Sequence, residues 1–187
     1  MSDARSALEA VAVVETSSIA RGFVALDALV KKAPVTVKLA RPMSPGKLVV
    51  VFGGAVEVTR ESHQAALEIL QSDLVDEVFL PGAHARLLPV MDQAISPVLG
   101  DAMGIVEMST VAAAVHAADV ALKSVDVAVL RMQLAVGVGG KGWFTIAGAL
   151  ADVGAALEAV KDTARADRVV AIELIAQPHG EVRGWMG

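Results

Sequence analysis

The chain contains no cysteine and no tyrosine among its 187 residues, and aromatic residues make up only 3% of it. Without thiols it cannot form disulfides, zinc–thiolate sites or cysteine-ligated iron–sulfur clusters, and it has no cysteine nucleophile. It also lacks a basic stripe with interleaved aromatic residues, and its formal net charge is -5. We therefore expect no nucleic-acid binding.

Long apolar runs are absent too, although 55% of the residues are hydrophobic and the mean hydropathy is +0.58. A charged residue interrupts each apolar run before it reaches about 18 residues, the length that a membrane span needs, so no membrane association is expected. The first ten residues carry Asp3, Arg5 and Glu9 and have no apolar segment of signal-peptide length. The surplus apolar surface is therefore expected to be buried within the domains or in an oligomer interface.

An internal repeat organises the sequence. The segment Val13–Ser18 recurs as Ile105–Thr110, and Asp27–Lys31 recurs as Asp119–Lys123, both 92 positions further on. The offset rises to 94 at the glycine-rich loops and to 95 at the end, as short loop insertions would cause. Self-similarity at a fixed period indicates duplicated units. We predict two domains, residues 1–98 and 99–187, joined near residues 96–100.

Each copy predicts the same order of elements, βαββαβ. Short β-branched apolar runs predict strands, and apolar residues at helical spacing predict helices. In the first copy the strands are expected at 11–15, 35–40, 48–52 and 75–80, with helices at 17–32 and 57–70. In the second copy the strands are expected at 103–107, 127–135, 143–147 and 168–175, with helices at 109–124 and 151–164. The fold class is α/β (α+β): a tandem duplication of a ferredoxin-like unit.

The loop Gly137–Gly142 satisfies the pattern G-x-G-x-x-G of dinucleotide-binding proteins. That pattern binds a pyrophosphate only when a helix follows it, and here Trp143–Ile146 predicts a strand. We interpret the loop as a hairpin connection that is equivalent to Pro42–Gly46 in the first copy.

The titratable residues do not predict a catalytic or metal site. His63 and His116 fall on predicted helices, where surface or interface placement is expected. Glu15 and Glu107 form a repeat pair that is expected to close each first strand through local hydrogen bonds. No Ser/His/Asp pattern of the G-x-S-x-G type occurs. Neither a catalytic residue nor a metal site is predicted.

Several of these motifs together resemble one known family. The segments Val14–Gly22, Asp27–Ala33 and Pro45–Lys47, and their counterparts Gly104–Glu107, Ala118–Lys123 and Gly137–Lys141, resemble the shell domain of bacterial microcompartments. The likeness spans both copies and is greatest to shell proteins with two unpermuted domains in tandem. It implies a structural, non-enzymatic protein without a cofactor, located in the shell of a microcompartment in the cytoplasm.

The resemblance also implies an assembly. Tandem members of the family form homotrimers, in which six domains make a pseudohexameric tile with a central pore for metabolites. Tiles then pack edge to edge with other shell proteins. Some tandem members hold an iron–sulfur cluster in the pore through one cysteine per subunit, and Ser44 stands at that position here, so a thiolate-ligated cluster is excluded.

Site residues follow from the same resemblance. The residues expected to line the pore are Ser44, Pro45, Gly46, Gly137, Val138, Gly139 and Gly140. The residues expected at the tile edges are Lys31, Lys123, His84 and His179. The arginine that the family usually has before the Pro-His is absent here: Gln177 precedes Pro178-His179, and Gly82-Ala83 precedes His84.

Charge near the loops suggests what passes through such a pore. Arg41, Lys47 and Lys141 lie close to the two loops in the sequence, which favours small polar or anionic metabolites. Lys31 and Lys123 also follow Asp27 and Asp119 at i and i+4, the spacing of a helical ion pair. Two other interpretations stay open: a regulatory protein that binds a small molecule between the two copies, and an enzyme.

Overall fold

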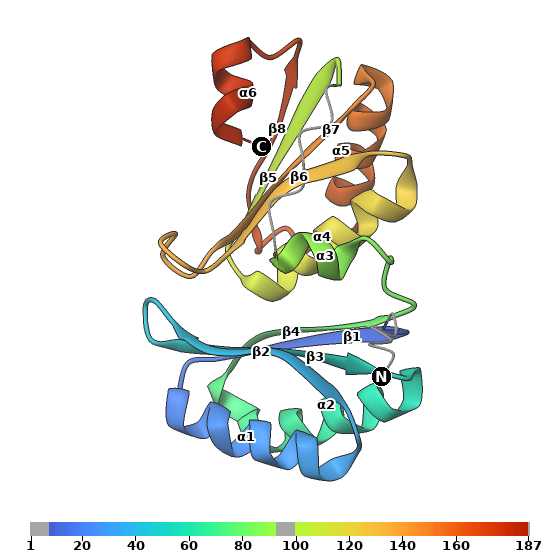
Figure 1. The fold of residues 1–187 in the computed structure, drawn as a ribbon. Coiled ribbons are helices and arrows are strands. Elements are labelled where there is room, and N and C mark those ends of the chain that lie inside the picture. The colour runs from blue at the N-terminus through green and yellow to red at the C-terminus, as the bar shows by residue number, and fades with distance from the viewer. Residues whose placement is uncertain (1–7, 93–99, 187) are drawn as a thin grey trace, which may run out of the picture. The chain divides into compact units, whose positions relative to one another are not determined.

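The computed structural model describes residues 8–92 and 100–186 of the chain. It divides into two compact units, the first built mainly from residues up to Ala85 and the second mainly from Arg86 onward (Figure 1). Most of the predicted link at residues 96–100 lies outside the described residues.

The first unit has the predicted order of elements. It comprises β1 (Ala10–Thr16), α1 (Ile19–Lys32), β2 (Thr36–Met43), β3 (Lys47–Gly54), α2 (Val56–Leu70), a short 3-10 turn (Gln71–Asp73) and β4 (Leu74–Pro81). The strands form one sheet in the order β2-β3-β1-β4, in which β1 is antiparallel to both of its neighbours. This order is that of a ferredoxin-like sheet, and α1 and α2 lie together on one face of it (Figure 1).

The second unit repeats this arrangement. It comprises α3 (Leu87–Asp92), β5 (Ala102–Met108), α4 (Val111–Ser124), β6 (Ala128–Leu134), β7 (Gly142–Gly148), α5 (Leu150–Thr163), β8 (Val169–Ala176) and α6 (Gly180–Met186). Its sheet has the order β6-β7-β5-β8. The βαββαβ prediction is confirmed for both copies. The two short helices that follow the last strands, α3 and α6, were not predicted.

The duplication extends to single hydrogen bonds. Gly82 donates its backbone N–H to the carbonyl of Glu9 at 2.7 Å, and Gln177 donates to the carbonyl of Asp101 at the same distance. Both donors have positive φ, 69° for the glycine and 49° for the glutamine. Residues at equivalent positions in the two copies can therefore be compared one by one.

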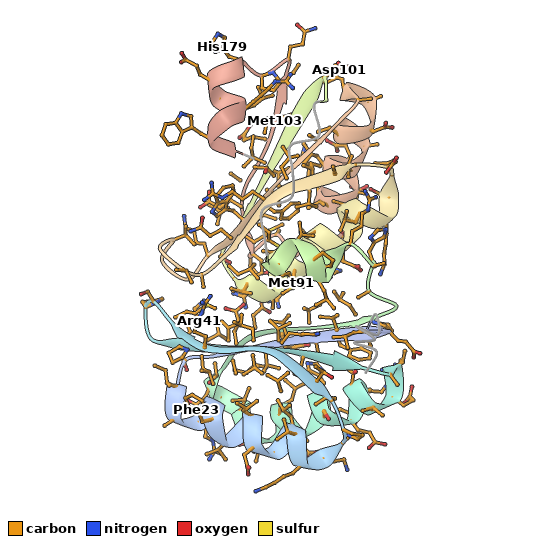
Figure 2. The ribbon with its side chains drawn as sticks, in the orientation of Figure 1. Phe23, Arg41, Met91, Asp101, Met103 and His179 are labelled. Atoms are coloured by element: carbon orange, nitrogen blue, oxygen red, sulfur yellow. The ribbon has the colours of Figure 1, made fainter. Side chains whose placement is uncertain are left out.

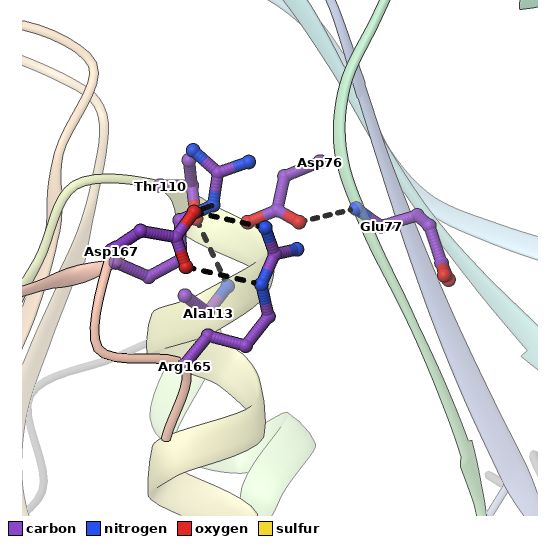
Figure 3. A network of polar contacts seen from close by, with 7 residues as sticks. Asp76, Glu77, Thr110, Ala113, Arg165 and Asp167 are labelled. Atoms are coloured by element: carbon purple, nitrogen blue, oxygen red, sulfur yellow. Dashed lines mark hydrogen bonds and ion pairs between the residues drawn. The ribbon is translucent and has the colours of Figure 1, made fainter. Parts of the chain in front are cut away.

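The helices α1 and α4, which follow the first strand of each unit, begin at a hydroxyl residue, as the sequence predicts. Ser18 accepts a hydrogen bond from the N–H of Arg21 at 3.2 Å, and Thr110 accepts from the N–H of Ala113 at 3.3 Å (Figure 3). Each hydroxyl thereby satisfies one of the free donors at a helix N-terminus.

The turn before β8 is closed by an ion pair. Arg165 donates to Asp167 through Nη2 at 2.9 Å and through Nε at 3.3 Å (Figure 3). Because both side chains are more than half exposed, the pair contributes little to stability.

Close helix–sheet packing is achieved differently in the two copies. In the first, a Cβ added to Gly22 on α1 would lie 2.6 Å from Leu48 Cδ2 on β3. In the second, a Cβ added to Gly142 on β7 would lie 2.5 Å from Ala114 Cβ on α4. Gly22 and Ala114 are repeat partners, as are Leu48 and Gly142. The glycine that allows the close approach of helix and strand is on the helix in the first copy and on the strand in the second.

One histidine lies in a different environment from the one expected. His63 on α2 is only 6% exposed, so its expected surface or interface placement is wrong. Its ring stacks on Phe79 at a centroid distance of 5.9 Å, and its Nε2 lies 3.0 Å from a carboxylate oxygen of Glu77. The aromatic residues of β3 and β4 pack over this helix position and enclose the imidazole.

Candidate functional site: the two hairpins and the helix edges

The first candidate pore segment is the turn between β2 and β3. Ser44, Pro45 and Gly46 form its tip, and all three are exposed. Gly46 has φ +112°, a conformation that side-chain-bearing residues rarely adopt. The hydroxyl of Ser44 and the backbone groups of the tip are therefore open to solvent.

The second candidate pore segment connects β6 to β7 and is longer. Gly137, Gly139 and Gly140 have positive φ values of 73°, 63° and 83°, which explains the glycine content of this loop. The loop is closed by a bond from Ala135 N to Lys141 O at 2.8 Å. The strand β7 follows directly, so the loop has no helix N-terminus with which to hold a pyrophosphate. Val138 is half-buried within the loop.

A lysine at the base of each hairpin is paired with a glutamate. Lys47 Nζ lies 3.2 Å from Glu15 Oε2, and Lys141 Nζ lies 2.8 Å from Glu107 Oε1. The sequence predicted local hydrogen bonds for these glutamates. The structure shows long-range partners, 32 and 34 residues away.

Sheet register explains why these pairs form. Glu15 is opposite Val49 across the β1–β3 ladder, so Lys47, two residues before Val49, falls on the same face as Glu15. Each pair compensates one positive charge beside its hairpin. Arg41, the third cation noted from the sequence, is exposed on β2.

A cation–aromatic contact near the second hairpin was missed by sequence reasoning. The guanidinium of Arg131 on β6 lies 5.5 Å from the centre of the Trp143 ring on β7. Arg131 also donates to the carbonyl of Trp185 at 3.4 Å. The sequence does place an arginine and a tryptophan on two neighbouring predicted strands. It does not show that the two side chains meet, because the pairing of β6 with β7 shifts between Val129 and Arg131.

The predicted edge lysines lie in the last turn of their helices. Lys31 Nζ is 2.6 Å from Asp27, and Lys123 Nζ is 2.5 Å from Asp119, so both predicted ion pairs are present. The first pair is exposed. In the second, the carboxylate of Asp119 is buried while the lysine stays partly exposed. The two lysine side chains are 72% and 41% exposed.

The repeated histidines follow the last strand of each copy. His84 is half-buried, and His179 is exposed just before α6 (Figure 2). His179 Nδ1 accepts a hydrogen bond from the backbone N–H of Glu181 at 3.4 Å. Within residues 8–92 and 100–186, the structure shows no group of three or more acidic, histidine or cysteine side chains able to hold a metal ion. No helix in the same ranges is long and apolar enough to cross a bilayer.

A family model described as the BMC domain matches this chain twice, over residues 10–83 and 102–178. The chain belongs to the BMC-domain family of bacterial microcompartment shell proteins. A curated relative from Citrobacter freundii, "Bacterial microcompartment shell protein PduT", is 34% identical over 172 residues, which cover 91% of this chain and 94% of the relative. The chain is accordingly a structural component of a microcompartment shell and not an enzyme.

Solved structures agree with this assignment. A microcompartment protein from Desulfitobacterium hafniense superposes with a TM-score of 0.80 at 31% identity, over 95% of this chain and 99% of that one. A fused permuted hexameric shell protein of the RMM microcompartment gives a TM-score of 0.61 at 21% identity, over 81% and 79% of the two chains. A double-ringed trimeric shell protein of the same microcompartment gives 0.63 at 16% identity, over 83% and 82%, and these last two establish the fold alone.

Proposed function

We propose that the chain forms a homotrimer whose six shell domains, residues 1–98 and 99–187 of each chain, make a pseudohexameric tile with a central pore. The observation that carries this proposal is the duplication, because the two copies share sheet order, register and hairpin position. Three chains that carry two equivalent domains each are suited to a closed ring of six.

The pore in this proposal is bordered by the two hairpins, through Ser44, Pro45 and Gly46 of one copy and Gly137–Gly140 of the other. Small polar or anionic metabolites are the solutes that such a border suits, because it offers a hydroxyl and exposed backbone groups. The glutamate partners of the two hairpin lysines moderate the positive charge there. The choice of solute then depends on hydrogen bonding to the pore border and on the width of the pore more than on the net charge of the solute.

Tile edges in this proposal are formed by Lys31 and Lys123, with His84 and His179 nearby, and they contact other shell proteins. Both lysines keep exposed ammonium groups beside their aspartate partners. Each can donate further hydrogen bonds, since an ammonium has three donors.

The assembly is tested by light scattering and electron microscopy. We expect a solution mass three times the 19.2 kDa of one chain, and flat sheets or tubes at high concentration. Lys31→Ala combined with Lys123→Ala should keep the trimer and abolish the sheets. Lys161→Ala is the matched control, since Lys161 is a helical lysine with its own ion-pair partner and comparable exposure. Sheets that persist without both edge lysines would contradict their role.

The pore is tested by solute flux through assembled shells. Ser44→Phe should slow passage of a small polar metabolite by narrowing the opening and removing a hydroxyl. Thr36→Phe, at the start of β2 and also exposed, should leave the flux unchanged. Equal flux in both variants would show that this turn does not border the opening.

A further inference from the structure

The helix α1 carries an apolar stripe that nothing covers in the described structure. Phe23 and Val30, seven residues apart on one side of the helix, are 48% and 44% exposed (Figure 2 labels Phe23). The opposite side of the helix packs on the sheet and on α2 through Gly22, Ala25 and Leu29. An exposed apolar stripe of this kind indicates an interaction surface.

The equivalent stripe on α4 is covered. The repeat partners of Phe23 and Val30 are Val115 and Leu122, which are buried. The short helix α3 packs against α4 and β6 (Figure 1). Its residues Leu87 and Val90 are fully buried. The helix of the second unit that is equivalent to α1 is therefore in contact with a short helix, the one that follows β4.

The short helix α6 also has apolar residues at the equivalent positions, but they are exposed. At the offset of 95, the partners of Leu87 and Val90 are Val182 and Trp185 on α6, which are 38% and 82% exposed. Arg183 holds this helix to its own unit by donating to the carbonyls of Pro178 at 2.9 Å and Gly100 at 2.8 Å. Within the chain, α3 packs on α4. The equivalent surfaces of α6 and α1 both carry exposed apolar residues.

We propose that α6 of one subunit packs on α1 of the next subunit in the way that α3 packs on α4 within the chain. This rests on the proposed trimer and specifies how its subunits are joined. The contact is heterologous, with different surfaces on its two sides, and such contacts close into a ring when the rotation allows it. Trp185 is the anchor, since buried tryptophans are enriched among residues that dominate interface energy.

Charge distinguishes the two contacts. Beside α3, Arg86 Nη2 pairs with Asp126 Oδ1 at 3.3 Å. The repeat partner of Arg86 is Glu181, and the partner of Asp126 is Pro34, two residues after the exposed Lys32. Glu181 therefore stands where the first copy has Arg86. Lys32 lies near the position on the first unit that is equivalent to Asp126.

This exchange of charges favours the packing of α6 on α1 over its packing on α4. Glu181 of one subunit attracts Lys32 of the next, whereas α6 placed on α4 would bring Glu181 toward Asp126. Like charges brought together in this way disfavour the wrong pairing. The charges thus direct α6 to α1 and away from α4.

Cross-linking tests the contact, because the chain has no cysteine to interfere. In a Phe23→Cys, Trp185→Cys double variant, a short bismaleimide should join subunits and give covalent dimers and trimers on a denaturing gel. The control pairs Trp185→Cys with Leu150→Cys, because Leu150 is 47% exposed on α5 and lies outside the proposed contact. We expect at least about tenfold more cross-linked chain from the first pair than from the control.

The outcomes separate this inference from the proposed assembly. A wild-type chain that is monomeric by light scattering would refute both. A wild-type trimer whose two cysteine pairs cross-link equally would overturn the α6–α1 contact and leave the trimer intact. A charge exchange gives a second measurement: Glu181→Lys should weaken the trimer by about tenfold or less in dissociation constant, and adding Lys32→Glu should restore it. No restoration would count against the contact.

Discussion

Replacing Gly142 with alanine should destabilise the second domain by filling the space through which β7 touches α4. The new Cβ would lie 2.5 Å from Ala114 Cβ and 3.2 Å from the carbonyl oxygen of Thr110. The first distance is far inside van der Waals contact, and both neighbours belong to a well-packed helix start. Extra methyl groups in a close-packed interior cost about 1–3 kcal/mol, and we expect a loss in that range.

The first copy suggests how the clash can be relieved. There the helix carries Gly22 and the strand carries Leu48, so a glycine on the helix accepts a larger strand residue. Ala114→Gly alone should cost roughly 1–2 kcal/mol, from lower helix propensity and a lost buried methyl group. Combined with Gly142→Ala, it removes the Cβ–Cβ clash. We therefore expect the double variant to lose only about 1–2 kcal/mol, a favourable coupling of about 1–3 kcal/mol.

The assay is chemical unfolding at one fixed protein concentration, since oligomerisation makes apparent stability depend on concentration. Trp143, the residue after Gly142, reports the unfolding of β7 by its fluorescence. The first copy gives a contrasting cycle with Gly22→Ala and Leu48→Gly: the added Cβ would lie 2.6 Å from both Leu48 Cδ2 and Thr16 Cγ2, so removing Leu48 relieves only part of the clash and we expect weaker coupling there. If the two substitutions in the second copy were additive within about 0.5 kcal/mol, the packing argument would be refuted.

Three further substitutions have defined outcomes. Thr110→Ala removes the side-chain acceptor for Ala113 N–H and should lower unfolding free energy by about 1 kcal/mol; no change in denaturation midpoint would contradict its capping role. Gly154→Ala on α5 meets no atom within 4 Å and should stabilise by up to about 1 kcal/mol, seen as a higher melting temperature. Glu107→Gln leaves the charge of Lys141 uncompensated and should raise anion flux relative to neutral solutes; an unchanged ratio would place this pair away from the solute path.

Local signals in the sequence predicted the elements well. The hydroxyls of Ser18 and Thr110 mark helix starts, because a cap depends only on residues within one turn. Likewise, the strand after Gly142 excluded a nucleotide loop, because that motif requires a helix directly after its glycines.

Contacts between distant segments were the part that could not be predicted. The pairing of Glu107 with Lys141 depends on strand register, which a single sequence does not fix. His63 was placed at the surface because its helix position gives no sign of the aromatic residues that enclose it. The short helices α3 and α6 were missed because each is at most seven residues long and is held by tertiary contacts such as those of Arg183.

A structure of the assembled protein by cryo-electron microscopy tests the central claim most directly. We predict a threefold ring of six domains, with the turns at residues 44–46 and 137–140 surrounding the axis. A single unassembled chain, or a ring that carries those turns on its outer rim, would contradict the account.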